Sequence, residues 1–486
     1  MPKLFLLLSE VIAMGIFGVA ASNHFGLADG LKITAALAIA YIIPCIILER
    51  SRGTSTAARI VLFLLTAFFL YADSERLIYC SLRDGYSLAH PYLKGDPLNY
   101  YTWALNQYYG SEESTTIVFP GFSWLMVGLW KVFGVSMAWP LAMNMMFTLT
   151  SVVLTGLTTR RLLSHRVKTS PEGLVFGGML LTCLLTFYLL IGTRMLKEGS
   201  IFISVSMAAF AMASMAGSDE ERYHRWRDLL IFTLSCILLA MVRTTYMYFI
   251  LFGLFLFTLS HPRRNWVQAL IMLVVFVLSF ALGNYFSSYS LGRHAEIVGG
   301  GWNMQRHYVI ADSQEFYHDV LNYYFLYSPW HKLLLLPLTL SVQFILPFPW
   351  NPGHHHLLDT VSRLTYGWFF LGGTALFYYV YLAWKRRERL GIWAWWAGGC
   401  YAVIAYMMAG SVARYVLPIQ PLFVPLAMYV LCRFREGKWR KAYLTWMILL
   451  GALVVIALLV YVEIQHGLIS HLLHTKPLLH YLYKYL

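Results

Sequence analysis

The chain of 486 residues is 59% hydrophobic and 12% charged, and its net charge at pH 7 is +14. A soluble protein of this length carries about twice that charged fraction, and apolar runs of about 17 to 22 residues, long enough to cross a bilayer, recur from end to end. These features exclude a soluble protein and predict an all-α, polytopic transmembrane helical bundle. A β-barrel is excluded because its strands alternate apolar and polar residues over short segments.

Hydropathy and the positions of basic residues together predict about thirteen crossings within a single transmembrane domain, residues 1–463. Basic residues follow the second span and place the N-terminus in the cytoplasm, because Lys and Arg concentrate in cytoplasmic loops. The same rule explains the net positive charge, so nucleic acid is not an expected partner. The predicted spans are 5–21, 32–48, 58–72, 137–157, 173–191, 200–216, one or two within 229–260, then 265–286, 366–384, 392–409, 415–432 and 443–463.

Residues 73–136 form a predicted extracytoplasmic loop with two juxtamembrane helices. The segment LNYYTWALNQYY, directly after Pro97, predicts an amphipathic helix that is too polar to span and lies in the membrane interface. Asp96 would lie at or next to the N-cap of this helix, where a carboxylate can simply act as a cap. The second helix is expected over 120–134, between a proline and a glycine.

The stretch 229–260 has two interpretations. As one helix, its 32 residues would be about 48 Å long, well over the hydrocarbon core of roughly 30 Å, and Arg243 would be buried near mid-membrane. Two shorter helices hinged at 242–246 instead place Arg243 at the outer surface. The sequence favours the hairpin.

A second extracytoplasmic loop is predicted over 287–365. It contains an apolar run broken by prolines, which we expect to be re-entrant or interfacial because irregular backbone at membrane depth must be shielded by protein. The C-terminal tail, 464–486, is placed on the same side. His354–His356 lie beside Asp359 in this loop, but three consecutive histidines are poorly spaced for a zinc site.

Four basic residues are predicted near the outer surface. Arg194 and Lys197 lie between two spans, whereas Arg243 and Arg414 each interrupt an apolar stretch. A charge at membrane depth is costly unless it is paired or functional, and Arg and Lys are the side chains that hold phosphate groups. The alternative interpretation of the first two is that they snorkel from helix ends to the surface.

Several segments resemble the GT-C-type polytopic glycosyltransferases, which use polyprenyl-linked sugar donors at the extracytoplasmic face. The likeness rests on GDPLNYYTWA, FPGFSWLMVGLWKVFG, RMLKEG, VRTTY, LPFPW and ARYVLPIQPLFVPLA, which sample the chain between about residues 90 and 430. Two features depart from the family pattern: two further spans precede the acidic loop, and Asp96 has no adjacent acid. Other acids of this loop are therefore alternatives, namely Asp73, Glu75, Asp84, Glu112 and Glu113.

The resemblance implies a membrane glycosyltransferase acting on a polyprenyl-(di)phosphate-linked sugar and a lipid- or glycan-linked acceptor, in the plasma membrane of a bacterium. Asp96 would be the catalytic base, which takes the proton of the acceptor hydroxyl. The phosphate ligands would be Arg194, Lys197, Arg243 and Arg414, and the residues lining the sugar or acceptor groove would be Tyr100, Tyr101 and Trp103. No cofactor is required, because a lipid phosphate is already an activated leaving group; a divalent cation is left open.

Three alternatives remain at this point. An O-antigen-polymerase-like or ligase-like enzyme would use a lipid-diphosphate oligosaccharide and depend more on arginines than on a carboxylate. A flippase or transporter for polyprenyl-linked sugars would be expected to show internal inverted repeats, and no such repeat is visible in the sequence. A lipid-binding scaffold would need no catalytic residue.

Overall fold

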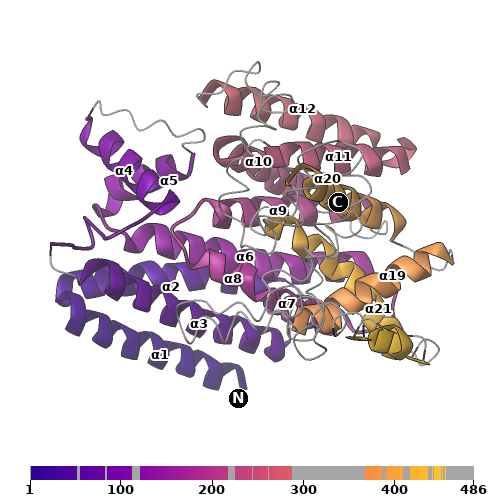
Figure 1. The fold of residues 1–486 in the computed structure, drawn as a ribbon, viewed down its shortest axis with the longest axis horizontal. Coiled ribbons are helices and arrows are strands. Elements are labelled where there is room, and N and C mark those ends of the chain that lie inside the picture. The colour runs from indigo at the N-terminus through magenta and orange to yellow at the C-terminus, as the bar shows by residue number, and fades with distance from the viewer. Residues whose placement is uncertain are drawn as a thin grey trace, which may run out of the picture.

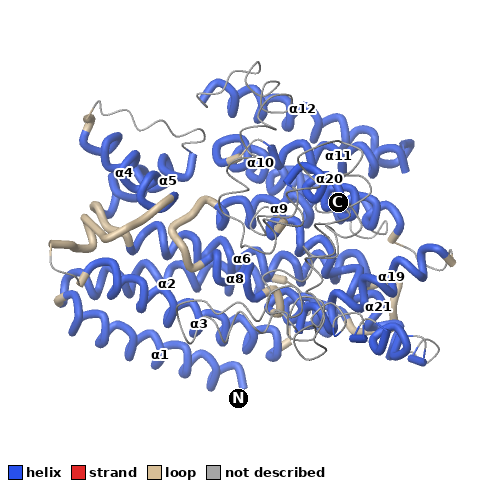
Figure 2. Tube along the Cα trace, viewed as in Figure 1, coloured by secondary structure: helices blue, strands red, loops and turns tan. Residues whose placement is uncertain are grey.

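In the computed structural model, the described part of the chain is a bundle of helices (Figures 1 and 2). The residues described are 2–51, 55–82, 85–111, 121–216, 225–243, 245–260, 262–286, 367–385, 390–408, 416–435, 440–441, 443–449, 451–452 and 455. The predicted loop 287–365 and tail 464–486 lie outside these ranges.

The first half of the bundle comprises α1 (Pro2–Phe25), α2 (Leu27–Arg50), α3 (Thr56–Ser81), α4 (Asp96–Tyr109), α5 (Gly121–Phe133), α6 (Ala138–Leu163), α7 (Pro171–Cys183), α8 (Thr186–Gly192) and α9 (Glu198–Ala216). The second half comprises α10 (Arg225–Val242), α11 (Thr245–Ser260), α12 (Pro262–Phe286), the π-helix η2 (Trp368–Gly373), α19 (Thr374–Trp384), α20 (Gly391–Met408), the 3₁₀-helix η4 (Leu417–Phe423) and α21 (Val424–Arg435).

Within the described residues, five helical segments are long and apolar enough to cross a membrane. They are Leu27–Arg50, Thr56–Ser81, Ala138–Leu163, Glu198–Met215 and Leu417–Phe434. Shorter apolar helices, such as Pro171–Cys183 and Tyr246–Leu259, accompany them. The all-helical class is therefore confirmed for the described residues, and the long apolar helices indicate a membrane protein; the number of crossings stays a prediction.

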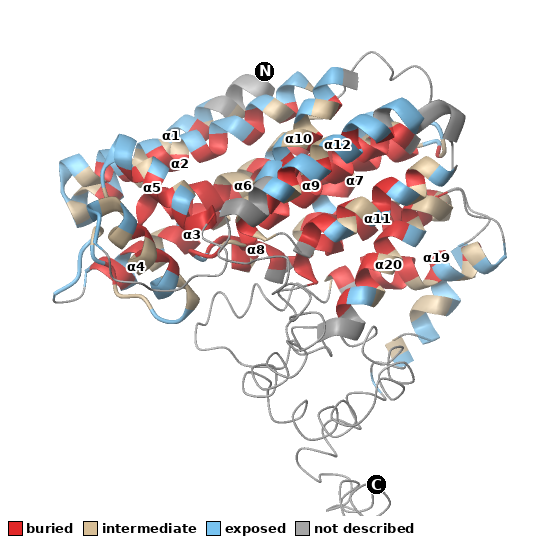
Figure 3. Cartoon of the chain, turned by 90° about the horizontal axis from the view of Figure 1, so that it is seen from above, coloured by how far each residue is buried: buried red, intermediate tan, exposed pale blue. Residues whose placement is uncertain are grey.

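Helix α6 is the central element of the bundle. Nearly all of its side chains are buried, and it packs against α2, α7 and α9 (Figure 3). Gly156 allows the close approach of α7, because a Cβ atom at this position would lie 2.7 Å from the carbonyl oxygen of Val175. Small residues at such contacts let the backbones of neighbouring membrane helices approach each other.

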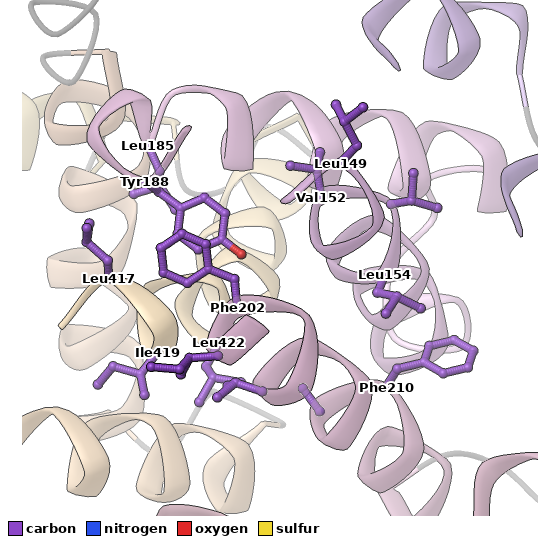
Figure 4. Packing of buried hydrophobic residues seen from close by; sticks show 14 of the residues in the cluster. Leu149, Val152, Leu154, Leu185, Tyr188, Phe202, Phe210, Leu417, Ile419 and Leu422 are labelled. Atoms are coloured by element: carbon purple, nitrogen blue, oxygen red, sulfur yellow. The ribbon is translucent and has the colours of Figure 1, made fainter. Parts of the chain in front are cut away.

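Aromatic and aliphatic side chains of α8, α9 and η4 complete the core beside α6. The rings of Tyr188 and Phe202 stack with their centroids 3.9 Å apart, and Ile419 and Leu422 lie close to them (Figure 4). The chain positions involved are more than 200 residues apart, so this packing joins the two halves of the described bundle.

Two of the described spans differ most from their predicted bounds. Helix α3 continues to Ser81 instead of ending at residue 72, because Asp73 is buried against neighbouring helices while Glu75, about 200° around the helix, is exposed. The predicted span 173–191 is divided into α7 and α8, since the backbone of Leu185 leaves the helical region with ψ of 62°. The sequence carries neither proline nor glycine at this break.

The stretch 229–260 is divided into two helices, and Arg243 lies directly after the first. Helix α10 runs antiparallel to α9. The hydroxyl of Ser235 donates to the carbonyl oxygen of Ser204 at 2.7 Å, and Arg161 joins Phe210, later in α9, to Asp228, earlier in α10. Helix α11 then runs back along α9. Gly253, in the middle of α11, lies against Met212, and Met212 is about 21 Å from the first residue of α9. This arrangement is the one expected of a hairpin.

At one end of the bundle, a buried ion pair joins α6, α9 and α10. The guanidinium of Arg161 donates to a carboxylate oxygen of Asp228 at 3.1 Å and to the carbonyl oxygen of Phe210 at 2.7 Å. The same guanidinium lies over the ring of Phe210, 3.9 Å from its centroid. The side chains of Arg161 and Asp228 are 5% and 1% exposed, so this contact fixes three helices with hardly any access to solvent.

Replacement of Arg161 by Met should destabilise the protein by up to about 3–5 kcal/mol, because the buried Asp228 would keep only its longer contact, 3.6 Å, with the exposed Arg227. Lys168→Met, which removes an exposed cation from the loop after α6, is the matched control and should change little. The measurement is the midpoint of thermal unfolding in detergent. Equal midpoints for the two variants would contradict a stabilising role for the pair, and Arg161→Met/Asp228→Leu should recover part of the loss.

Candidate functional site

The first juxtamembrane helix, α4, starts at Asp96, as the sequence predicts. Gly95 precedes it with φ of 63°, a backbone conformation that glycine adopts far more readily than other residues. Asp96 therefore lies in the first helical turn beside Pro97 and is half-buried. A carboxylate in this place interacts favourably with the positive end of the helix dipole.

Helix α5 packs along α4 through aromatic side chains. The rings of Tyr100 and Phe122 meet edge to face at 5.7 Å, and those of Trp103 and Trp124 do so at 5.3 Å. The hydroxyl of Ser123 also donates to the backbone carbonyl of Tyr100 at 3.0 Å. The two helices lie together at one end of the bundle (Figure 1), beside the start of α6, whereas Arg161 lies near the end of that helix.

Tyr101 has a structural position that differs from its predicted role. Its hydroxyl donates to the carbonyl oxygens of Ala89, at 3.0 Å, and Leu88, at 3.3 Å, and its ring lies against Trp130. Burial raises the pKa of this hydroxyl above its usual value, so it remains a protonated donor. With 2% of its surface exposed, Tyr101 holds α4 to the preceding segment and is not available to line a sugar groove.

The loop between α8 and α9 carries Arg194 and Lys197, and α6 holds this loop in place. The side-chain amide of Asn144 donates to the carbonyl oxygens of Arg194, at 2.6 Å, and Leu196, at 2.8 Å. Gly199 lies directly against Asn144, since a Cβ at that position would be 2.5 Å from the amide oxygen. The loop is therefore fixed both by hydrogen bonds and by close packing.

Lys197 meets α4 at Tyr100. Its ammonium nitrogen lies 5.7 Å from the centroid of the tyrosine ring, within the range of a cation–π interaction. Asp96 is one helical turn before Tyr100 and so lies on the same side of α4. The structure thus brings together an acid, an aromatic ring and a cation from two distant segments. Arg194, at the start of the same loop, is exposed.

Arg243 approaches the same region from α10. The pairing of Ser204 with Ser235 places the start of α9 level with Met241, at the end of α10. Gly121, the first residue of α5, lies against Met241 so closely that a Cβ would overlap its carbonyl group. Arg243 follows two residues later, half-buried, with its guanidinium 5.9 Å from the ring centroid of Tyr246. Arg414 lies outside the described residues.

The structure draws attention to Asp73, which the sequence offered only as an alternative to Asp96. Its carboxylate is fully buried, and neither oxygen has a hydrogen-bond partner among the described residues. The Nε of Arg76, on the next turn of α3, is also buried without a hydrogen-bond partner among the described residues. Ser81 bonds to Met137, at the beginning of α6, so Asp73 lies about 12 Å into the bundle from this end. In the sequence, three charged residues within 73–76, where the apolar run ends, are the signal that could have indicated Asp73 and Arg76.

The remaining acids of the predicted loop are less informative. Glu75 is exposed, and Asp84, Glu112 and Glu113 lie outside the described residues, as do His354–His356 with Asp359. In the described part of the chain, no three His, Cys, Asp or Glu side chains gather as metal ligands.

No family model matches the chain, and no curated protein or solved structure was found to be similar to it. Its function therefore has to be inferred from the residues gathered at this end of the bundle: Asp73, Arg76, Asp96, Tyr100, Lys197 and Arg243.

Replacing Asn144 by Leu should release the Arg194–Lys197 loop, because two carbonyl groups lose their donor at a cost of about 1 kcal/mol each. We expect the amides of Arg194 and Leu196 to exchange with deuterium at least about tenfold faster. Mass spectrometry of the protein in nanodiscs measures this exchange. Asn99→Leu, on the exposed side of α4, is the control; unchanged protection of the loop in Asn144→Leu would contradict the anchoring role.

Proposed function

We propose that the protein is an integral-membrane glycosyltransferase. It moves a hexose or pentose from a polyprenyl-(di)phosphate-linked donor to a lipid- or glycan-linked acceptor, in the assembly of cell-surface polysaccharide. The observation that carries the proposal is the position of the Lys197 ammonium over the ring of Tyr100, one helical turn from Asp96. An acid and a phosphate-binding cation on the same side of α4 are groups that this transfer needs.

The reaction requires one proton transfer and one bond exchange at the anomeric carbon. The carboxylate of Asp96 takes the proton of the acceptor hydroxyl as its oxygen attacks that carbon. The bond between the carbon and the phosphate oxygen breaks, and the lipid phosphate leaves with the electron pair. Lys197 and Arg243 lie where they can neutralise the charge that develops on this phosphate. No step needs an oxidant or a cofactor.

The other residues proposed from the sequence take supporting roles. Arg194, at the exposed start of the loop, would meet the phosphate at the surface, and Arg414 is retained from the sequence alone, as a charge that interrupts an apolar stretch. Trp103, which is half-buried, would position the sugar. Tyr100 and Tyr101 are left out of the proposed groove because both are buried and their rings already have partners.

Asp73 is a second candidate for the base, favoured by its burial. A carboxylate without a hydrogen-bond partner in an apolar interior is costly, and such a cost is commonly retained where a substrate supplies the missing partner. The acceptor hydroxyl would have to enter between α3 and α6 to reach it. Arg76, one turn nearer the end of the helix, would accompany the phosphate in that case.

The topology proposed with this function has about thirteen crossings in a bacterial plasma membrane, with the site at the extracytoplasmic face. Support for this orientation comes from the opposite end of the bundle, where the loop after α6 contains Arg166 and Lys168 and α6 ends with Arg160 and Arg161. Basic residues of this density are typical of cytoplasmic loops.

Replacement of the catalytic base by its amide should lower transfer by at least about 100-fold while the protein still folds. Asp96→Asn and Asp73→Asn are to be compared. Glu75→Gln is the control, since Glu75 is an exposed acid on the other side of α3 from Asp73. Transfer is measured in membranes loaded with radiolabelled lipid-linked sugars of the same cells. Full activity in both Asp variants would refute carboxylate catalysis and favour the polymerase-like or ligase-like alternative.

Lys197→Met and Arg243→Met should each weaken binding of a polyprenyl phosphate by about tenfold or more, since a hydrogen bond to a charged group contributes roughly 1.5–3 kcal/mol. Titration of undecaprenyl phosphate onto the purified protein, followed by native mass spectrometry, measures this affinity. Lys131→Met removes an exposed cation from α5 and is the control. Affinities equal to the control in both variants would remove these residues from the phosphate site.

A further inference from the structure

Three tyrosines outside the proposed site meet in the segment that joins α3 to α4. The rings of Tyr86 and Tyr92 contact edge to face at 5.1 Å, and those of Tyr79 and Tyr92 at 6.3 Å. The ammonium of Lys94 lies 5.2 Å from the ring centroid of Tyr92. Tyr79 is 48% exposed and Tyr86 is 43% exposed. These four side chains form an exposed surface that we call the tyrosine platform.

The backbone beneath the tyrosine platform is held firmly to its neighbours. The amide of Tyr92 donates to the carbonyl oxygen of Cys80 at 2.8 Å, which joins the segment to α3. Leu88 accepts from the amide of Met137 at 2.8 Å and from the hydroxyl of Tyr101, which joins it to α6 and α4. A surface ordered in this way loses little conformational entropy when a ligand binds.

The tyrosine platform lies at the same end of the bundle as the proposed site. Tyr79 follows Arg76 by one turn of α3, and Lys94 precedes Asp96, the first residue of α4, by two positions. A molecule whose reactive group lies beside Asp96 or Asp73 can therefore extend across these rings. Lys94 adds a positive charge at the edge of this surface, which favours an anionic substituent.

Contact with lipid is the competing explanation, because tyrosines are common at membrane interfaces. The segment beneath the rings is irregular and contains Ser87, His90 and Lys94, and irregular backbone exposed to lipid does not occur within the hydrocarbon core. Tyrosine offers a large rigid ring together with a hydroxyl, at a low cost in side-chain entropy. Such surfaces suit a sugar ring, whose C–H face packs on the aromatic ring while its hydroxyl groups form hydrogen bonds.

We propose that the tyrosine platform binds an oligosaccharide portion of the acceptor, and that Lys94 favours chains with acidic substituents. The inference rests on the proposed glycosyltransferase function and narrows its acceptor to a glycan. Tyr86 provides an exposed ring that is not part of a helix, and Tyr79 and Tyr92 hold the orientation of the surface.

Saturation-transfer NMR on the full chain in nanodiscs tests the proposal with two probes, a hyaluronan hexasaccharide as the acidic glycan and maltohexaose as the neutral one. We expect the acidic probe to bind more tightly, and Tyr86→Ala to weaken binding of both by about tenfold or more. Tyr86→Phe should retain most of the affinity, because the ring remains. Lys94→Ala should abolish the preference for the acidic probe.

Tyr109→Ala is the matched control, since Tyr109 is 63% exposed at the far end of α4. Equal binding in Tyr86→Ala and Tyr109→Ala would overturn the proposal. Absence of binding by both probes, with a fluorophore at position 86 quenched by brominated phospholipids, would overturn it in favour of lipid contact. These measurements use free glycans and no donor, so they can fail while the tests of Asp96 and Lys197 succeed.

Discussion

The two hydrogen bonds from the Asn144 amide to the carbonyl oxygens of Arg194 and Leu196 are the contact on which the candidate site depends. Asn144 projects from α6, the central and largely buried helix, where an amide has few other partners. Its bonds fix the loop that presents Lys197, and Lys197 in turn meets α4 at Tyr100. Without these two hydrogen bonds, the position of Lys197 relative to Asp96 on α4 would not be fixed.

Buried charged side chains differ in their hydrogen bonding between the two ends of the bundle. At one end, the Arg161 guanidinium donates to one oxygen of the Asp228 carboxylate and to a carbonyl group, lies over an aromatic ring, and so joins three helices. At the other end, the carboxylate of Asp73 and the Nε of Arg76 lie in the interior without hydrogen bonds among the described residues. A buried polar group in this condition costs free energy that a ligand can recover. Both oxygens of Asp73 are in this state, whereas one oxygen of Asp228 is bonded, so the second end is the better place for a binding site.

Much of the architecture could be predicted from the sequence, because hydropathy and helix-terminal signals are local. The start of α4 at Asp96 follows from the Gly–Asp–Pro sequence, and α5 ends before Gly134, whose φ is 85°. The break at Arg243 followed from the length of the apolar stretch, which exceeds one bilayer crossing.

Other features depend on tertiary packing and could not be predicted. Tyr100 and Tyr101 are adjacent in sequence, yet a helix turns by about 100° between neighbours, so one faces Lys197 and the other faces the 88–89 backbone. The burial of Asp73 depends on the packing of α3 against other helices. Because Asp73 is charged, the sequence predicted that the span ends at residue 72 and that a loop follows. The role of Asn144 depends on a loop some 50 residues later. Its amide in an apolar span was the one sequence signal that could have indicated it.

An electron cryo-microscopy structure with undecaprenyl phosphate bound tests the central claim most directly. The account predicts phosphate density between α4 and the α8–α9 loop, with an oxygen about 3 Å from the ammonium of Lys197 and the prenyl chain leaving between helices at that end. Phosphate density instead at the opposite end, beside Arg166 or Lys168, would contradict the account.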